Sequence, residues 1–316
     1  MTAITNLWSR LQAHPKRLKR CQKDAFLTVA EHYLTEWGYA VSRHQSKNIV
    51  NCVNLQTECE QPSYLFLAHY DTPTMMPFWL SGMFKLFGHT RQIILTLVLI
   101  VLIVVLGTLE ATWAHLLYWV LIGSFLMLLI PNPNNANDNT SGVLGVLELA
   151  RRLADDPELK SRVKFALVDN EEWGLLGSSV LRQHLRGQGV RLSGMRIISL
   201  DCIGAGTYPM VIQNGKSDFA GDLHNILAAE RPQSLHRNLG IVPMSDNYSF
   251  RDLGAVNISF FNKALIPGGY VIDHVHSYKD AEIDVENVAW VASALEQFVR
   301  DDVIAGENHS DIANRG

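Results

Sequence analysis

Two adjacent apolar runs in the middle of the chain constrain its fold more strongly than any other feature. Residues 92–109 and 111–130 contain no Asp, Glu, Lys or Arg, and Glu110 alone separates them. A helix that crosses a bilayer needs about 20 apolar residues, with a lower limit of about 17. Buried helices of soluble proteins are usually shorter and amphipathic. We therefore expect the two runs to form a transmembrane hairpin of two spans rather than two core helices.

The charges beside the hairpin predict its orientation. Lys85 and Arg91 precede the first span, and the connection from Gly107 to Trp113 contains no Lys or Arg. Basic residues concentrate on the cytoplasmic side of membrane proteins. The N-terminal segment lacks the apolar core of a signal peptide, and two spans return the chain to its starting side. We expect a multi-pass membrane protein whose part outside the hairpin lies in the cytoplasm.

Charge and cysteine content exclude other classes of protein. The chain has 27 basic and 31 acidic residues and a net charge of −4, so no overall basic field favours a nucleic-acid partner. The four cysteines lie far apart without CxxC spacing, which argues against a disulfide framework and against a structural zinc ribbon. One local basic cluster is either a solvated helix face or a contact with anionic lipid: Arg10, Lys16, Arg17, Lys19, Arg20 and Lys23.

Outside the hairpin, β-type segments alternate with amphipathic helical segments. Strands are expected at 39–44, 48–55, 63–71, 163–169, 195–201, 210–213 and 255–261, and helices at 24–38, 143–153, 173–185, 217–230 and 285–303. This alternation predicts an α/β fold with a mixed, largely parallel sheet sandwiched by helices. A short amphipathic piece over 77–89 suits the membrane interface, and a flexible tail is expected over 306–316.

Acidic and histidine residues recur where the expected strands end. They are His69, Asp71, Asp138, Asp169, Glu171, Glu172, Asp201 and His276. Ligands of α/β sheets bind at the carboxyl ends of the strands, so these side chains are expected to converge. Carboxylates packed together repel one another unless cations neutralise them. Imidazole and carboxylate ligands without thiolate suit Zn²⁺ or a similar ion in a catalytic site.

Six segments, in this order, resemble motifs of the M28 family of co-catalytic zinc aminopeptidases. They are AHYDTP (68–73), NDNTSG (137–142), NEEWGLLGS (170–178), SLDCIG (199–204), SDNYSF (245–250) and HSYKD (276–280). The fifth departs from the family pattern, with Asn247 where His is usual. The resemblance implies a discontinuous zinc-exopeptidase-like domain formed by residues 1–77 and 131–305, into which the membrane hairpin, residues 78–130, is inserted.

The resemblance also implies a set of metal ligands. Asp138 would bridge two divalent metal ions, most naturally Zn²⁺. His69 and Asp201 would complete one site, and Glu172 and His276 the other. His274, two positions before His276, is expected to be an ordinary loop residue.

The family pattern assigns two further residues to catalysis. Glu171 would be the general base that takes a proton from a water activated by the two metals. Asp71 would accept a hydrogen bond from the second ring nitrogen of His69 and so fix its tautomer. Tyr248 and Tyr270 are both candidates for a donor to the developing oxyanion.

Three functions are compatible with these motifs. The leading hypothesis is a membrane-anchored, metal-dependent aminopeptidase or amide hydrolase whose peptide or aminoacyl substrate lies near the bilayer. Glutaminyl cyclases resemble the same family and act through a single zinc as aminoacyltransferases. A catalytically silent scaffold is the third, and the retained ligand candidates with Glu171 count against it. Metal analysis and a panel of aminoacyl and N-terminal glutaminyl substrates separate the three.

Overall fold

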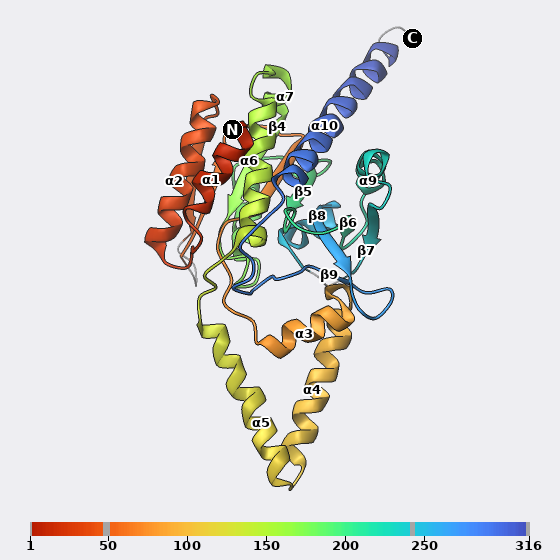
Figure 1. Cartoon of the computed structure of the whole chain (residues 1–316). Helices are drawn as coiled ribbons and strands as arrows, with labels where there is room; N and C mark the ends of the chain where they lie inside the picture. Colours follow the sequence, from red (N-terminus) through yellow and green to blue (C-terminus); the bar gives the residue numbers. More distant parts are fainter. Residues whose placement is uncertain (1, 47–50, 241–243, 314–316) are drawn as a thin grey trace.

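The computed structural model describes residues 2–46, 51–240 and 244–313, which form an α/β body and a projecting hairpin (Figure 1). The strands are β1 (Val41–Ser46), β2 (Cys52–Thr57), β3 (Tyr64–His69), β4 (Val163–Val168), β5 (Arg196–Leu200), β6 (Tyr208–Gln213), β7 (Leu235–Asn238), β8 (Val256–Lys263) and β9 (Tyr270–Val271). Their order is β1-β2-β4-β3-β5-β8-β6-β7, with β9 paired to β8. The central strands β4, β3, β5 and β8 are parallel, and antiparallel neighbours flank them. The predicted mixed, largely parallel sheet is confirmed.

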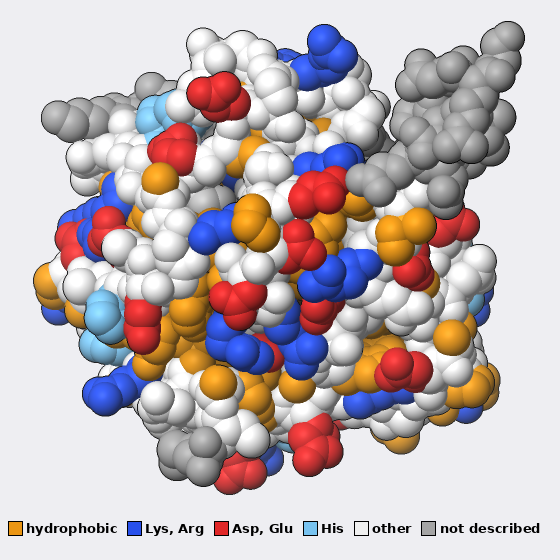
Figure 2. All heavy atoms as spheres, turned by 90° about the horizontal axis from the view of Figure 1, so that it is seen from above, with side chains coloured by type: hydrophobic (Ala, Val, Ile, Leu, Met, Phe, Trp, Pro, Cys, Tyr) orange, Lys and Arg blue, Asp and Glu red, His pale blue; other side chains and the backbone are white. Residues whose placement is uncertain are grey.

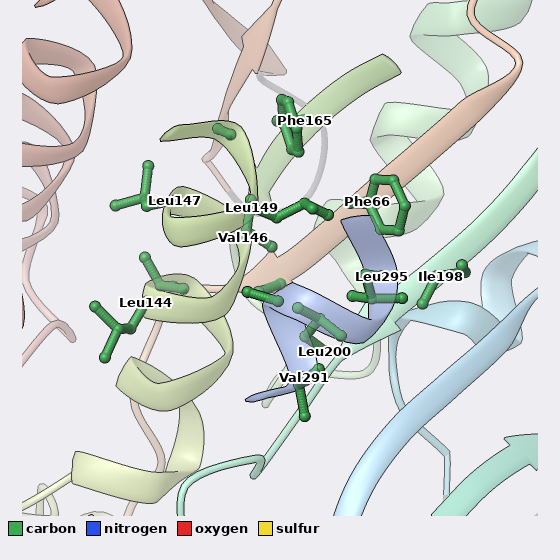
Figure 3. Close-up of a cluster of buried hydrophobic side chains, with 14 of the residues drawn as sticks. Phe66, Leu144, Val146, Leu147, Leu149, Phe165, Ile198, Leu200, Val291 and Leu295 are labelled. Carbon is green, nitrogen blue, oxygen red and sulfur yellow. The ribbon is translucent and has the colours of Figure 1, made fainter. Parts of the chain in front are cut away.

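Helices cover both faces of this sheet. They are α1 (Ala3–Gln12), α2 (Arg20–Glu36), α6 (Gly142–Leu153), α7 (Pro157–Arg162), α8 (Leu176–Gly187), α9 (Ala220–Glu230) and α10 (Val285–Ala313). Alternate residues of β3 face opposite cores: Phe66 packs with Leu147 of α6 and Leu295 of α10, whereas Leu67 packs with Leu181 of α8. Figure 3 shows the first of these cores. Each such buried side chain contributes about 1.5–3 kcal/mol, so β3 is held from both sides.

The hairpin consists of α3 (Phe78–Phe87), α4 (Gln92–Thr108) and α5 (Thr112–Ser124), and it projects away from the sheet (Figure 1). Two helical segments, His89–Thr108 and Thr112–Leu129, are long and apolar enough to cross a membrane, and only 11% of each is buried. Outside residues 78–130, the exposed large apolar side chains of the described chain are Trp173, Met244, Leu265, Tyr278 and Ile304. The opposite end of the molecule mixes acidic and basic side chains (Figure 2). The exposed apolar surface is therefore concentrated in the hairpin.

The hairpin is joined to the body through residues 74–91, here called the hairpin base. The segments that enter and leave the hairpin form an antiparallel bridge between Thr74 and Pro131. The backbone N–H of Met76 donates to the carbonyl of His276 at 2.9 Å. The same base packs against β9. The hairpin is thus bonded to the segment that carries one of the expected metal ligands.

Several boundaries differ from the sequence-based expectation. Helix α10 extends to Ala313 and so runs into the segment 306–316, which was expected to be a flexible tail. The second apolar run ends as a 3₁₀ helix, Phe125–Leu129, rather than as a continuous α-helix. The short α7, β7 and β9 carry no clear periodicity and were not expected. Residues 48–50 of the second expected strand lie outside the described residues.

Candidate active site

The turn before α6 presents Asp138 at the end of β5. The side chain of Asn139 accepts a hydrogen bond from the Gly142 N–H (2.9 Å) and donates one to the carbonyl of Leu200 (2.9 Å). A Cβ atom at Gly142 would lie 2.2 Å from the same carbonyl oxygen, so only glycine permits this approach. The turn therefore fixes Asp138 beside the end of β5, where Asp201 follows.

Asp71 organises the ends of β3 and β4. Its two carboxylate oxygens accept hydrogen bonds from the backbone N–H groups of Glu171 (3.0 Å) and Glu172 (3.3 Å). Its Oδ1 also lies 3.6 Å from Nδ1 of His69. Because β3 and β4 are parallel neighbours, their carboxyl ends meet at one edge. Asp71 thus lies between the His69 ring and the turn that carries both glutamates, but the hydrogen bond expected between Asp71 and Nδ1 of His69 is not formed at this distance.

The five expected metal ligands converge around Asp138. Its Oδ1 lies 3.5 Å from Nε2 of His69, and its Oδ2 lies 3.4 Å from Nε2 of His276. The same ring nitrogen of His69 lies 3.6 Å from Asp201 Oδ1, and that of His276 lies 3.5 Å from Glu172 Oε2. The structure therefore brings together, from five separate segments, the set that the motifs predicted, with Asp138 at its centre.

The donor atoms fit divalent cations. His69, Asp138 and Glu172 offer ligand atoms within 4.8 Å of one another, and so do Asp138, Asp201 and Cys202. Asp138 belongs to both groups, as a bridging carboxylate must. Imidazole and carboxylate donors suit Zn²⁺. The chemistry of this donor set matches the group that the motifs imply.

The acidic groups of the site repel one another. Burial raises the pKa of Asp138 to about 8, opposed by His69 and assisted by Asp201 and Asp280. Burial, followed by Asp138 and Glu171, raises the pKa of Glu172 well above its usual range. Burial lowers the pKa of His276 to about 4, which favours the neutral imidazole that binds metals. A cation between these groups would offset the repulsion that otherwise favours protonated carboxyls.

The cluster opens into a cavity of about 320 Å³. Its polar lining includes Glu171 beside the five ligand candidates, and its apolar lining includes Met76, Phe84, Met244, Ile272 and Val275. Burial raises the pKa of Glu171 well above its usual range, opposed by His69 and assisted by Asp246 and Asp201, which suits a group that must take up a proton. The cavity can therefore hold an apolar side chain next to a polar reacting group.

Residues 114–297, more than half of the chain, match the sequence profile of peptidase family M28. The chain belongs to this family. A curated relative is the probable lipoprotein aminopeptidase LpqL of Mycobacterium tuberculosis, 45% identical over 49 residues. That match covers 16% of this chain and only 10% of the length of the relative.

Two solved structures show the same fold over nearly the whole chain. One is a Zn-dependent exopeptidase from Parabacteroides distasonis (TM-score 0.63, 13% identity). The match covers 94% of this chain and 96% of the exopeptidase chain. The other is glutaminyl cyclase from Porphyromonas gingivalis (TM-score 0.62, 16% identity). That match covers 95% of this chain and 98% of the cyclase chain. The M28 family and the zinc-exopeptidase-like fold predicted from the motifs are confirmed.

Two of the six residues in the basic cluster near the N-terminus, Arg17 and Lys23, have a different role from either expected one. Arg17 is fully buried, and its guanidinium donates hydrogen bonds to the carbonyls of Tyr70 and of His14 (2.8 Å). Lys23 is also buried, where it forms an ion pair with Asp169. A solvated face and a lipid contact are therefore both wrong for these two residues. Long basic side chains with buried partners look like surface residues in a sequence, because the partners are distant in the chain.

Two acidic residues of the site were given no role by the sequence. Asp280 accepts hydrogen bonds from the N–H groups of Asn137 (2.7 Å) and Asp138 (3.0 Å) and so supports the turn beneath the cluster. Asp246 is buried, and burial raises its pKa to about 7. Both lie inside matched motifs, so their position in HSYKD and SDNYSF was the available signal. A cysteine of the site, Cys202, was also given no role; it has a left-handed backbone conformation at φ 57°.

Other expectations can be placed in the structure. His274 is exposed, whereas the His276 ring reaches Asp138, as the motif spacing predicted. Tyr248 lies under the guanidinium of Arg251, and Tyr270 packs edge-on against Tyr208. Neither tyrosine belongs to the lining of the cavity as far as the described residues define it. The two tyrosines proposed as oxyanion donors therefore lose their support.

Proposed function

We propose that the protein is a membrane-anchored, zinc-dependent aminopeptidase. The observation that carries this proposal is the cluster of His69, Asp138, Glu172, Asp201 and His276, with Glu171 in the same cavity. Two donor groups that share Asp138 are compatible with two metal ions. The M28 relatives and the aminopeptidase name of the curated relative support the same reaction class.

The chain's own residues have distinct tasks in peptide hydrolysis. Zinc bound at the cluster would lower the pKa of a water molecule and polarise the scissile carbonyl. Glu171 takes the proton from the attacking water and delivers it to the leaving amine. Asp71 holds the backbone of the Glu171 turn and orients the ring of His69. The acidic surroundings also attract the free amino group of a peptide, which would select for cleavage at the N-terminus.

The decisive experiment is an activity screen of the detergent-solubilised protein. Aminoacyl nitroanilides and short peptides should be hydrolysed, activity should be lost with a chelator, and re-added Zn²⁺, Mn²⁺ or Co²⁺ should restore it. Formation of pyroglutamyl peptides and ammonia from N-terminal glutaminyl substrates, without peptide hydrolysis, would instead support the cyclase alternative. The similar fold of the bacterial glutaminyl cyclase is the reason to test it. Bound metal without turnover of either substrate class would support a silent binding protein.

The exposed apolar surface of the hairpin supports a bilayer as its environment. Side chains such as Leu97 (58% exposed), Val101 (60%) and Leu116 (68%) point outward from α4 and α5. An exposed apolar surface of this extent marks a membrane or interaction site. The hairpin is inserted between two segments of the metal cluster, His69 and Asp138, so the cavity lies beside the hairpin base and close to the membrane surface.

We expect both ends of the chain to lie in the cytoplasm. The two spans return the chain to its starting side, and Lys85 and Arg91 lie before the first span. Cysteine labelling of intact cells with a membrane-impermeant reagent checks this. A cysteine placed at the C-terminus should be protected, and one placed at Glu110 should be modified. Modification of the C-terminal cysteine in intact cells would reverse the orientation.

We also expect the hairpin to bias the enzyme towards substrates at the membrane surface. The measurement compares the full protein in liposomes with a variant in which residues 93–124 are replaced by a short Gly/Ser loop that preserves the base. For each protein, the measured quantity is the ratio of kcat/KM for a lipid-anchored peptide to kcat/KM for the same peptide in soluble form. This ratio should be higher for the full protein than for the variant. Equal ratios in the two proteins would show that the hairpin serves only as a tether.

A further inference from the structure

The hairpin contributes a polar residue to the catalytic cavity. Met76, Phe84, His89 and Gln92, all from the hairpin base or the first turn of α4, line the cavity together with the metal cluster. His89 is buried, with 9% of its surface exposed. Its ring lies flat against Phe84, with the ring centroids 4.2 Å apart and the planes 6° from parallel. The position of this imidazole is therefore defined by packing.

A hydrogen bond defines the protonation of the His89 ring. Its Nδ1 accepts from the backbone N–H of Ile272 at 3.1 Å. A ring nitrogen that accepts a hydrogen bond carries no proton, so a neutral His89 carries its proton on Nε2. This Nε2 is buried and has no hydrogen-bond partner among the described residues. A buried donor without an acceptor is costly, so His89 adds to the lining of the cavity a donor whose hydrogen bond is not made within the described residues.

The backbone around His89 is held rigidly against the β9 segment. Gly88 has φ +90°, and a Cβ atom there would lie 2.5 Å from the backbone nitrogen of Tyr270. The Thr90 hydroxyl accepts from the N–H of Tyr270 at 3.1 Å. Arg91 donates to the carbonyl of Pro267 at 2.8 Å. The close contact and the bonds on both sides of His89 fix the ring before any substrate arrives.

We propose that the Nε2–H of His89 donates a hydrogen bond to the first carbonyl oxygen beyond the scissile bond of a bound peptide. This inference rests on the proposed aminopeptidase function, in which the scissile carbonyl is polarised at the metal cluster. The Nε2–H of His89, a second and fixed donor in the same cavity, then binds the next carbonyl oxygen along the bound peptide. Peptides that continue past the first residue gain this bond, and aminoacyl derivatives with a single carbonyl do not. His89 is thus a specificity residue supplied by the hairpin.

The test compares two substrates in three full-length, zinc-loaded proteins in detergent. Leucyl-glycinamide has a carbonyl beyond the scissile bond, and leucyl p-nitroanilide has none. In His89→Asn, the shorter side chain can still accept from the Ile272 N–H through Oδ1 but no longer places a donor at the Nε2 position. The matched control is His274→Asn at the exposed histidine, whose φ of +64° asparagine tolerates.

We expect His89→Asn to lower kcat/KM for leucyl-glycinamide about 10-fold, as the loss of one buried hydrogen bond to a substrate predicts. The kcat/KM for leucyl p-nitroanilide and the zinc content should stay within about twofold of the wild-type values, a range well below the effect of one such bond. The control, His274→Asn, should leave kcat/KM unchanged for both substrates. An equal loss for both substrates, or no loss for the dipeptide, would overturn the proposal.

A second measurement keeps the proposal separate from the proposed function. If the wild type hydrolyses neither substrate, the aminopeptidase assignment fails, and calorimetry then decides the role of His89. Leucyl-glycinamide should bind the wild type about 10-fold more tightly than His89→Asn. The corresponding amine that lacks the glycyl carbonyl should bind both proteins equally. Binding of both ligands that is insensitive to the substitution contradicts a donor role.

Discussion

Replacing Glu171 by Gln is expected to abolish turnover while zinc remains bound. The amide is nearly the same size as the carboxylate, but it cannot take a proton from the attacking water. Loss of a general base lowers rates by about 10²–10⁴-fold. Glu171 lines the cavity, and its backbone N–H donates to Asp71, a bond that the substitution preserves. The measurements are kcat on a leucyl substrate and zinc content by elemental analysis.

The control for this prediction is Glu282→Gln, the same change at an exposed glutamate after the HSYKD motif. It should leave both kcat and zinc content unchanged. Near-wild-type activity in Glu171→Gln would remove Glu171 from the role of base. A parallel loss of zinc would instead place Glu171 among the ligands.

Replacing Asp138 by Asn should have its largest effect on metal binding. Asp138 lies within 3.5 Å of His69 and 3.4 Å of His276, so a bridging role requires its full negative charge between two cations. We expect zinc content to fall to about one ion per chain or less, with a corresponding loss of activity, because a two-metal site depends on the shared ligand. Zinc titration with a competing chelator measures the change.

Two comparisons make this result specific. Asp71→Asn should weaken zinc binding by only about 10–100-fold, as expected for a residue that acts on a ligand from outside the metal's immediate neighbours. Asp155→Asn, at an exposed position after α6, should have no effect. Unchanged zinc stoichiometry in Asp138→Asn would exclude the bridging role.

Strong periodicity and strand-end polar residues made much of the fold predictable. The pattern SYLFLAHYD identified the buried strand β3, and the uninterrupted apolar runs identified the hairpin helices. The five ligand candidates were found because each closes a strand or a turn inside a motif with fixed spacing. Those positions are local in the sequence, and the parallel arrangement of the sheet brings them together.

The residues that the sequence did not predict depend on long-range contacts. Lys23 pairs with Asp169, 146 positions away, and His89 accepts a hydrogen bond from Ile272, 183 positions away. No local pattern distinguishes such a lysine from a solvated one, or such a histidine from an ordinary residue at the end of a helix. The same limitation applies to β7, which pairs with the outer edge of β6, and to β9, which pairs with the end of β8 where β8 extends beyond β5.

The place of β3 in the sheet has a consequence for how the protein is made. In the finished sheet β3 lies between β4 and β5, yet the hairpin separates it from both along the chain. Translation proceeds at about 5–20 residues per second, so a hairpin inserted as it leaves the ribosome would hold β3 at the membrane for several seconds before its neighbours emerge. During that interval Phe66 and Leu67 lack their packing partners from α6, α8 and α10. Biogenesis of this enzyme should therefore depend on a chaperone that shields the nascent first segment beside the insertion machinery.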